Sequence, residues 1–413
     1  MKKTICWLLL AALLTGCAHA QPQPSEEIQT ETPIQSEPAA QIPAVEGYDD
    51  FAAVLSAAVI DGKSNKNLSP VSVYIALAMT AEGARGRTQE ELLALLGEEK
   101  AEDVRKKAEE MLEDLRISGK NSELSLADSI WLGEQAGGAS FHEAYLTILS
   151  DSYDAKADSV CFGTAEAGER IAAWIREKTR DKVKISEDAM QFDADTLAVL
   201  LNTIYLTDGW RMPFDKDLTE KGVFYGPDGE RQAEYMRRKD QDKTIVRGEG
   251  FLRYALPLDE VGTMVFVLPD EGVTLESLLD SPAKVKELLT GGSSSAADVD
   301  LMVPKFGFQD RTDLENILMS LGVQTCFTGG ADFSLMTDTP AHVSRVLQES
   351  YIGVDENGVT AAAYTLIAMT KGASVPVERE KVDFHLTRPF LYAIISSDGI
   401  VLFIGTVTAP DKA

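Results

Sequence analysis

The sequence DENGVTAAAYT, residues 355–365, holds two acidic residues, a glycine and then small uncharged residues. The uncharged run continues further, because the first charge after Glu356 is Lys371 and the first proline is Pro376. As an extended strand, residues 359–370 would present two faces without charge and keep every backbone N–H free to pair. Taken alone, such an Ala- and Thr-rich run is more typical of a buried strand or helix than of a loop, so its meaning depends on its surroundings.

The chain upstream of this segment has the features of several helices. Ser69-Pro70 predicts a helix start, with serine as N-cap and proline at the first helical position, where its missing N–H costs nothing. Residues 71–80 are apolar nearly all round, which predicts a buried helix. Thr88, with Glu91 three residues later, predicts a capping box at the next helix. Apolar residues at helical spacing predict further helices at 48–60, 102–115 and 166–179.

Strand features dominate later in the chain. Residues 196–206 form a long, almost wholly apolar run rich in Leu, Val and Ile, as expected for a strand covered on both faces. Asp398-Gly399 predicts a hairpin turn between the last two strands. Further strands are expected at 124–132, 263–268, 299–308, 390–395 and 400–407. Helices early and long strands later predict a mixed α+β domain with a large sheet.

The N-terminus has the features of a targeting segment. A positive start at residues 2–3 precedes an apolar stretch, residues 7–14, that is too short to span a bilayer comfortably. The sequence LTGC, residues 14–17, resembles the lipobox of bacterial lipoproteins, in which the cysteine becomes the lipid-bearing N-terminus. An ordinary cleaved signal is the alternative. We therefore expect a signal peptide at 1–17 and an extracytoplasmic protein held on a membrane by Cys17.

The rest of the composition indicates a spacer and one domain. Residues 18–46 are rich in Gln, Pro, Glu, Ser and Thr, which predicts a disordered acidic spacer. No Pro/Gly-rich linker or repeat divides residues 47–413, so a single domain is expected. The 39 basic and 66 acidic residues favour solubility and argue against nucleic-acid binding. We expect Cys161 and Cys326 to be buried small hydrophobes rather than a disulfide.

Short motifs along residues 48–411 resemble, in the same order, landmarks of the serpin family of protease inhibitors. They are NLSPVS (67–72), GARGRT (83–88), LNTIY (201–205), PKF (304–306), DFS (332–334), RPF (388–390) and LFIG (402–405). Each motif is weak alone, but seven collinear motifs over such a span are highly specific. The resemblance implies the serpin fold: helices packed on a large mixed or antiparallel sheet, smaller sheets, and an exposed reactive loop at about 356–376.

DENGVTAAAYT is similar to the hinge of inhibitory serpins. The matching residues are Glu356, Gly358, Val359, Thr360, Ala361, Ala362 and Ala363. In that family a protease acylates itself on the loop, and the loop then inserts into the main sheet and traps the enzyme. Strand alternation would put Val359 on the core face and Thr360 on the face pointing away. The resemblance therefore implies an inhibitor of serine or cysteine proteases, without catalytic residues, cofactor or metal of its own.

Further positions resemble the parts of serpins that open the sheet. Ser69, Ser72 and Asn202 match the polar shutter positions under the sheet, and Trp210 matches the aromatic residue where insertion begins. The family usually has a histidine at the position that Gln348 occupies here. An amide still donates and accepts hydrogen bonds, so we expect altered opening energetics rather than lost function.

The scissile bond has three candidates. The usual loop length, counted from Glu356, leads to Gly372-Ala373, and one step earlier lies Lys371-Gly372; Met369-Thr370 is the third. A small residue before the bond would suit an elastase- or subtilisin-like protease, whereas lysine would suit a trypsin-like one.

Two other functions remain open. The first is a non-inhibitory serpin, for which the bulky Tyr364 is the main sign. The second is a lipoprotein that binds small solutes, which would explain the anchor and the spacer but none of the collinear motifs. The partners expected for an inhibitor are a protease and, through the lipid, a membrane. A monomer is expected.

Overall fold

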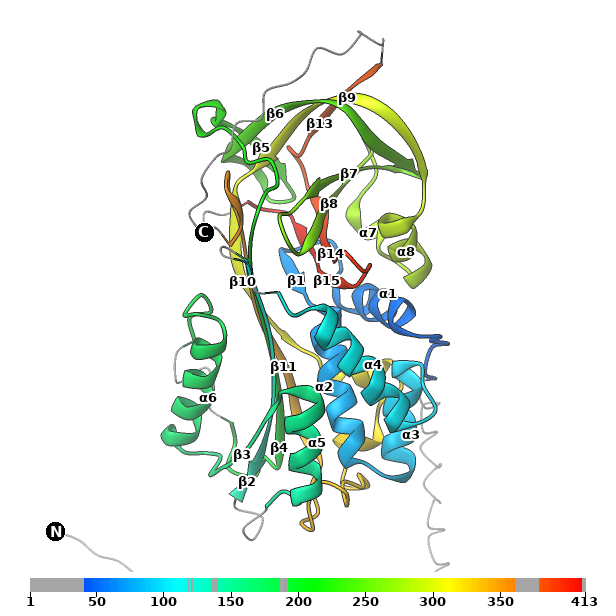
Figure 1. Ribbon diagram of the computed structural model, residues 1–413, viewed down its shortest axis with the longest axis vertical. Coiled ribbons are helices and arrows are strands. Elements are labelled where there is room, and N and C mark those ends of the chain that lie inside the picture. The colour runs from blue at the N-terminus through cyan, green and yellow to red at the C-terminus, as the bar shows by residue number, and fades with distance from the viewer. Residues whose placement is uncertain are drawn as a thin grey trace, which may run out of the picture. The chain divides into compact units, whose positions relative to one another are not determined.

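Two sheets hold the strands of the part of the chain that the structure describes, and helices cover both faces of the smaller sheet (Figure 1). The computed structural model describes residues 41–117, 119, 122–134, 140–185, 190, 192–360 and 379–410. Within these residues the helices are α1 (Tyr48–Val59), α2 (Pro70–Gly83), α3 (Gly86–Leu96), α4 (Ala101–Asp114), α5 (Glu143–Tyr153), α6 (Ala165–Lys178), α7 (Leu275–Leu278), α8 (Pro282–Thr290) and α9 (Glu315–Ser320).

The larger sheet has nine strands, in the order β1-β15-β14-β8-β7-β6-β9-β13, with β5 paired to β6. Their bounds are β1 (Lys66–Leu68), β5 (Glu220–Gly226), β6 (Gly229–Gly248), β7 (Phe251–Pro257), β8 (Gly262–Pro269), β9 (Ser293–Pro304), β13 (Glu380–His385), β14 (Phe390–Ser396) and β15 (Val401–Val407). The hairpin expected at the end of the chain is present, and its turn residue Gly399 has a φ of 90°, which favours glycine.

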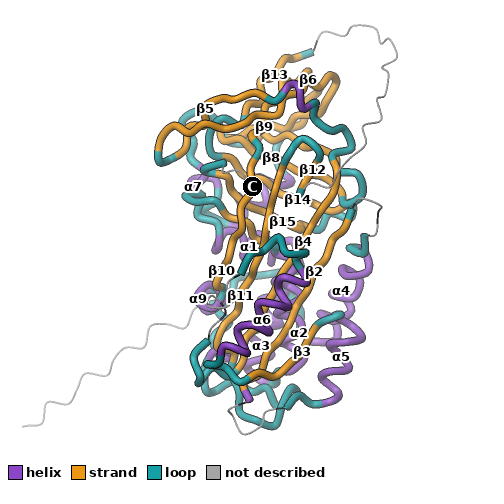
Figure 2. Tube along the Cα trace, turned by 90° about the vertical axis from the view of Figure 1, so that its left-hand side faces the viewer, coloured by secondary structure: helices purple, strands orange, loops and turns teal. Residues whose placement is uncertain are grey.

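The smaller sheet has six strands, in the order β10-β11-β12-β4-β2-β3. They are β2 (Glu123–Gly133), β3 (Lys156–Val160), β4 (Ala198–Gly209), β10 (Phe306–Asp313), β11 (Val343–Val354) and β12 (Gly358–Val359). Every residue of β4 is buried, as its apolar sequence predicts. One side of β4 belongs to the core shared with α2, and the other side packs in a second cluster with α6, which lies in front of the sheet in Figure 2.

Helix α2 begins where the sequence predicts. Ser69 is its N-cap, with Pro70 in the first turn, and all residues of the helix are buried. The capping box expected at the next helix is wrong, because α3 begins at Gly86 with Arg85 as N-cap. The Glu91 carboxylate instead accepts hydrogen bonds from the backbone of Gln324 and Thr325, so it fixes a distant loop.

Three other expectations differ from the structure. The strand expected at 299–308 is two strands of different sheets, β9 and β10, separated at Lys305. The longest strand, β6, was not expected because its polar, charged sequence lacks the apolar alternation of a half-buried strand. Cys326 is buried as expected, but Cys161 is exposed, and both are free thiols.

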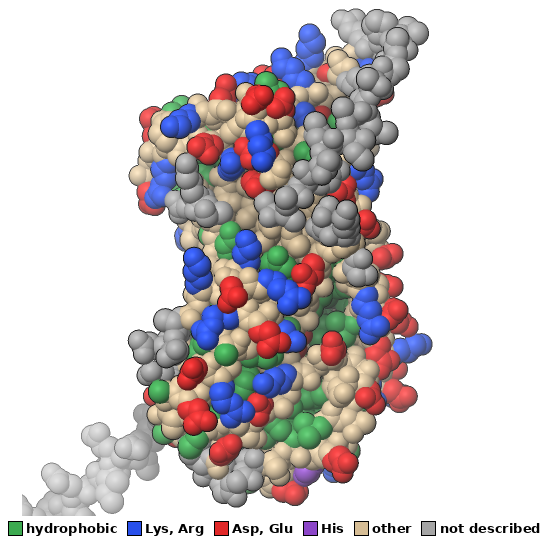
Figure 3. Space-filling model, turned by 60° about the vertical axis from the view of Figure 1, so that its left-hand side comes forward, with side chains coloured by type: hydrophobic (Ala, Val, Ile, Leu, Met, Phe, Trp, Pro, Cys, Tyr) green, Lys and Arg blue, Asp and Glu red, His purple; other side chains and the backbone are tan. Residues whose placement is uncertain are grey.

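The net charge of −27 does not form a single acidic field on the face shown in Figure 3. Acidic and basic side chains are interspersed there, with apolar side chains between them (Figure 3). The two sheets and the helices packed on them confirm the expected α+β class.

Candidate functional site

The six-stranded sheet contains a seam between two parallel strands (Figure 2). Residues 198–204 of β4 pair with residues 343–350 of β11, and no further pairs of these strands follow among the described residues. Beyond that point β12 lies between them, antiparallel to both, with Val359 opposite Asp208 on one side and Val354 on the other. The seam is therefore closed along most of its length and holds a short strand at one end.

Gly358 and Val359 are fixed in the seam by close packing. A Cβ atom on Gly358 would lie 2.1 Å from the backbone oxygen of Asp208, so a side chain here would push β12 away from β4. Val359 is fully buried in the core on the α2 side of the sheet. The first residues of the expected hinge are thus already part of the sheet.

Thr360 is buried rather than placed on an open face, so the expectation that its side chain points away to a tolerant surface is wrong. Its φ of 49° is unusual for a β-branched residue, and strand alternation holds only while the backbone stays extended. Its N–H donates to the Gly353 carbonyl at 2.5 Å, and its carbonyl accepts from the Thr207 hydroxyl at 3.1 Å. Its own hydroxyl has no hydrogen-bond partner among the described residues.

The turn before β12 is held by the segment that follows β4. The Trp210 backbone N–H donates to the Asn357 carbonyl at 2.9 Å, and its indole N–H donates to the Asp355 carbonyl at 2.8 Å. The Phe214 N–H donates to the Glu356 carbonyl at 2.9 Å. Trp210 therefore fixes the turn from which β12 begins.

Glu356 anchors this turn as a carboxylate. It accepts from the Thr219 hydroxyl at 2.8 Å and lies 3.1 Å from Lys305 Nζ. Burial acts to raise the pKa of Glu356, but hydrogen bonds from its own N–H, Thr219 and Lys305 outweigh burial and leave the pKa below its usual value.

Asp208 is a site residue that the sequence analysis missed. Its buried carboxylate accepts from the Ser122 hydroxyl at 2.7 Å and from the backbone N–H groups of Gly209, Glu260 and Val261. These bonds fix the end of β4 beside the hinge. The only signal in the sequence is an Asp-Gly pair directly after an apolar run, which also fits an ordinary turn.

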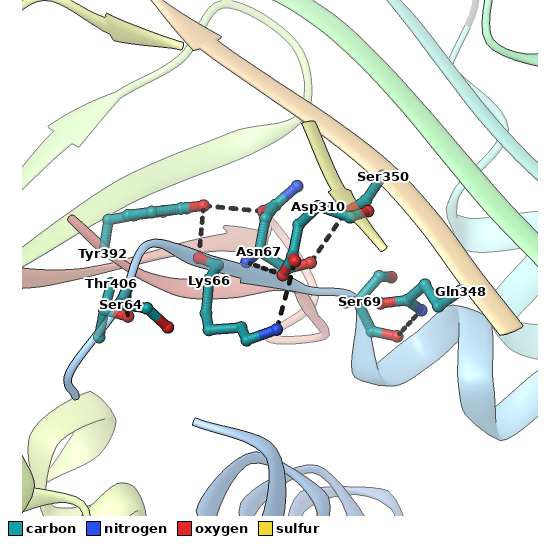
Figure 4. A network of polar contacts seen from close by, with 9 residues as sticks. All are labelled: Ser64, Lys66, Asn67, Ser69, Asp310, Gln348, Ser350, Tyr392 and Thr406. Carbon is teal, nitrogen blue, oxygen red and sulfur yellow. Dashed lines mark hydrogen bonds and ion pairs between the residues drawn. The ribbon is translucent and has the colours of Figure 1, made fainter. Parts of the chain in front are cut away.

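Ser69, Asn202 and Gln348 meet on the α2 side of the seam. Figure 4 shows the contact between Ser69 and Gln348. Gln348 Oε1 accepts from the Ser69 N–H at 2.8 Å, while Nε2 donates to the Ser69 carbonyl at 3.0 Å and to Asn202 Oδ1 at 2.7 Å. The Asn202–Gln348 bond joins β4 to β11 across the seam. Ser72 joins only through its N–H, which donates to the Ser69 hydroxyl at 3.4 Å. Trp210 lies apart from these residues, about 26 Å further along β4.

The same polar network ties the seam to the larger sheet (Figure 4). The Asn67 carbonyl in β1 accepts from the Ser350 hydroxyl at 2.8 Å, and the Asn67 N–H donates to the Asp310 carboxylate at 2.9 Å. Tyr392 in β14 donates its hydroxyl to Asn67 Oδ1 at 2.8 Å. Ser350, which ends the β4–β11 ladder, is therefore fixed to Asn67 of β1, and Asn67 is in turn fixed to Asp310 of β10 and Tyr392 of β14.

Gln348→Met should destabilise the native protein, because a side chain of similar shape would leave the buried Ser69 N–H and Asn202 Oδ1 without partners. Each orphaned group costs about 1–3 kcal/mol, so the thermal midpoint should fall by about 5 °C. Gln232→Met, at an exposed position, is the matched control. Equal midpoints for the two variants in a calorimetric scan would contradict the importance of this network.

One group of side chains could hold a metal ion. Asp300, Asp383 and His385 place one potential ligand atom each within 4.8 Å of one another. Asp300 also lies 3.5 Å from Arg237 and 3.7 Å from Lys239. These cations compete for the same carboxylate, so the group is better described as an ion-pair cluster between β9 and β13.

Several expected site residues lie outside the described residues. They are the lipid-bearing Cys17, the hinge residues Ala361, Ala362 and Ala363, and the scissile-bond candidates Met369, Thr370, Lys371, Gly372 and Ala373. The described part of the site is therefore the seam, the shutter residues and the hinge as far as Thr360.

The six-stranded sheet thus holds the short strand β12 between β4 and β11. Residues 46–410 match the family model "Serpin (serine protease inhibitor)". The chain therefore belongs to the serpin family, as its motifs indicate.

Known serpins are similar to nearly the whole chain. An uncharacterized serpin-like protein of Methanosarcina mazei is 28% identical over 420 residues, covering 98% of this chain and 96% of that protein. An antitrypsin of Bombyx mori is 28% identical and covers 87% of this chain and 92% of that protein. The crystal structure of the thermophilic serpin tengpin in its native state matches with a TM-score of 0.77 and 26% identity, covering 90% of this chain and 97% of that one.

Proposed function

We propose that the protein is an inhibitory serpin, which traps a serine or cysteine protease by inserting its cleaved loop into the six-stranded sheet. The observation that carries this proposal is the position of β12, which already occupies the open end of the seam. Belonging to the family supports a protease as partner, while trapping itself is our inference.

The seam has the length that the loop requires. If β12 continued in its present register, Thr365 would lie between Asn202 and Gln348, and Met369 would reach Ala198, the first residue of β4. This slot accepts residues 358–369, about 40 Å of strand. It ends just before Lys371, the first charged residue of the loop, so the whole inserting segment is free of charge and proline.

The slot also fits the two faces of the loop. Val359 already faces the α2 side, and the same register would turn Ala361, Ala363 and Thr365 to that side. Small side chains enter a packed core without overfilling it. Tyr364 would fall on the α6 side, so its bulk does not enter the core around α2.

Insertion would supply the driving force for trapping. A new strand between β4 and β11 would pair with both, and each net hydrogen bond is worth on the order of 1 kcal/mol, with apolar burial in addition. An acylated protease would then be carried along the sheet and distorted before it can deacylate. The inhibitor needs no catalytic group for this reaction, because the protease supplies the chemistry.

The test of inhibition is the loss of protease activity on incubation with increasing amounts of the protein. Elastase-like, subtilisin-like and trypsin-like enzymes should be compared, since the scissile-bond candidates differ in the residue they present. With the correct enzyme, activity should fall with time, in a ratio near one to one, and should not return on dilution. Full activity of every enzyme, with the loop cut, would contradict the proposal.

A non-inhibitory carrier is the alternative that a specific feature favours. A cavity of about 790 Å³ beside Thr360 could hold a small solute with polar and apolar parts. Its lining includes Lys182, Lys221 and Lys305, the acids Glu234 and Asp355, and the apolar side chains of Phe306 and Val354. A carrier of this kind would gain thermal stability from such a solute and would form no complex with a protease. These two measurements separate the functions.

We also propose that Cys17 is lipidated and holds the protein on a bacterial membrane surface. The LTGC sequence and the acidic spacer support this proposal. Among the described residues, no helix is long and apolar enough to cross a membrane.

Cys17→Ser should release the protein or leave it unprocessed, because the lipid-bearing thiol is lost. The wild type should partition into the detergent phase after extraction with a phase-separating detergent. A released variant should partition into the aqueous phase, and an unprocessed variant should be recognised by the added mass of its uncleaved signal peptide. Cys161→Ser, which changes an exposed cysteine of the folded part, is the matched control and should partition like the wild type. A wild type found wholly in the aqueous phase would contradict the anchor.

A further inference from the structure

Asp128 is a buried acid on the strand next to the seam. It lies in β2 directly opposite Asn202 of β4, and its side chain is 4% exposed. Asp128 Oδ1 accepts a hydrogen bond from Asn202 Nδ2 at 2.6 Å. Nothing in the sequence motifs pointed to this residue, since a single acid in a half-apolar strand also fits an exposed position.

A chain of three hydrogen bonds joins Asp128 to Ser69 across the seam. In each of them the donor is the residue nearer to Ser69. Because Asp128 Oδ1 accepts, Asn202 turns its amide nitrogen toward Asp128 and its oxygen toward Gln348. Gln348 must then present its nitrogen to Asn202, which leaves its oxygen for the Ser69 N–H at 2.8 Å. The acid at one end and the N–H at the other thus fix both amides in the orientation that closes the seam.

Among the described residues, no cation acts on Asp128: burial and the Asn202 hydrogen bond are the influences on its carboxyl group. The titratable side chains of the elements packed on β2 are Tyr74 and Glu82 on α2, Tyr205 and Asp208 on β4, and Lys156 and Asp158 on β3. The one cation among them, Lys156, is 3.2 Å from Asp158 and lies over the Trp131 ring on the α6 side. Glu82 is likewise held by its own partner, Arg105.

We propose that Asp128 is a positioning residue of the seam: it orients Asn202, and thereby sets how firmly the Asn202–Gln348 bond holds β4 to β11. The inference rests on the proposed function, because it concerns how readily the sheet opens for the loop. Asp128 touches neither the loop nor the protease in this role and acts only through the two amides.

In this role the carboxyl group of Asp128 makes the opening of the seam depend on pH. Burial raises the pKa of Asp128 to about 7, against the opposing effect of the Asn202 hydrogen bond. Opening the seam would admit water, which would return the pKa of Asp128 toward its ordinary value near 4. The closed seam then binds a proton that the open seam releases, so opening becomes easier as pH rises and levels off above about pH 7.

The titration of Glu349 must be separated from that of Asp128, because both groups change charge in the same pH range. Glu349 lies in β11 on the opposite face of the sheet, where burial raises its pKa to about 7 although Arg311 acts to lower it. Its carboxylate lies 3.5 Å from Gln309 Nε2 and 3.5 Å from Arg311 Nε, and it belongs to no part of the Asp128 chain. Glu349→Gln therefore provides a background in which Asp128 is the remaining acid of β2, β4 and β11 whose pKa burial raises to about 7.

The test is hydrogen exchange of the full chain at pH 6 and pH 8, read by mass spectrometry and corrected for intrinsic exchange. In Glu349→Gln, protection of the seam amides in 198–204 and 343–350 should fall about tenfold from pH 6 to pH 8. Adding Asp128→Asn should remove this fall and keep the seam protected at both pH values. Exchange in β14 and β15 serves as the internal reference for folding.

The outcomes are distinct. A tenfold fall that persists with Asp128→Asn, or no fall in either variant, would overturn the proposal. If β14 and β15 lose protection in the Asn variant, Asp128→Ser replaces it, because a small neutral hydroxyl carries the same prediction. Hydrogen exchange needs no protease, so a failure of the inhibitory function would appear in the activity assays and leave this result unchanged.

Discussion

Cleavage of the loop between Met369 and Ala373 is expected to raise the thermal midpoint of the protein by about 10–20 °C. Once cut, residues 358–369 are free to fill the seam, where they would pair with β4 and β11 along the full register set by β12. A net gain on the order of 10 kcal/mol follows from about a dozen paired residues, and in a domain of this size each kcal/mol shifts the midpoint by about 1–2 °C.

The measurement is a calorimetric scan of intact protein and of protein nicked by a protease that is afterwards inactivated. The two fragments should stay together on size-exclusion chromatography and separate only after denaturation. A nicked protein with an unchanged or lower midpoint would show that the seam does not take up the loop. That result would favour the carrier function.

Val359→Arg is expected to convert the inhibitor into a substrate. Val359 is fully buried between β4 and β11, so an arginine there would bury a charge without a partner or force β12 out of the sheet. A penalty of about 3 kcal/mol slows insertion on the order of 100-fold. Deacylation would then be faster than insertion, and the protease would leave active.

The measurement for Val359→Arg is a time course with the cognate protease, followed by a denaturing gel and an assay of residual activity. Two controls isolate the charge at this position. Val359→Ala removes bulk without adding charge, and Met212→Arg adds the same charge at a position that is 53% exposed near the hinge entry. Thr360→Arg is unsuitable as a control, since Thr360 is itself buried. Trapping by Val359→Arg as complete as that of the wild type would contradict the hinge assignment.

The elements that could be predicted from the sequence are those whose neighbouring residues fit only one kind of secondary structure. Ser69 followed by Pro70 suits a helix start, and the apolar run of β4 suits a strand covered on both faces. The strand β6 could not be found in this way, because its charged residues pair across strands that are distant in sequence. Glu91 was misassigned because its partners, Gln324 and Thr325, come close only in the folded chain.

The residues of the site also divide into those that could be predicted from the sequence and those that could not. The hinge assignment rests on the resemblance to the serpin family, because a segment without charge or proline, taken alone, also fits an ordinary buried strand or helix. The orientation of Thr360 could not be predicted, because it depends on a single backbone angle at the end of β12. Asp128 and Asp208 could not be predicted as site residues for a related reason. A buried acid is recognised by the hydrogen-bond donors around it, and only the folded chain brings these donors close.

Trapping itself is tested most directly by a denaturing gel of the protein mixed with each candidate protease, combined with mass spectrometry of the products. The account predicts a band of the summed mass of inhibitor and enzyme that resists boiling in detergent. It also predicts release of a C-terminal fragment that begins at Thr370, Gly372 or Ala373, which identifies the scissile bond. Complete cleavage of the loop by every enzyme, with free active protease and no band of summed mass, would contradict the central claim.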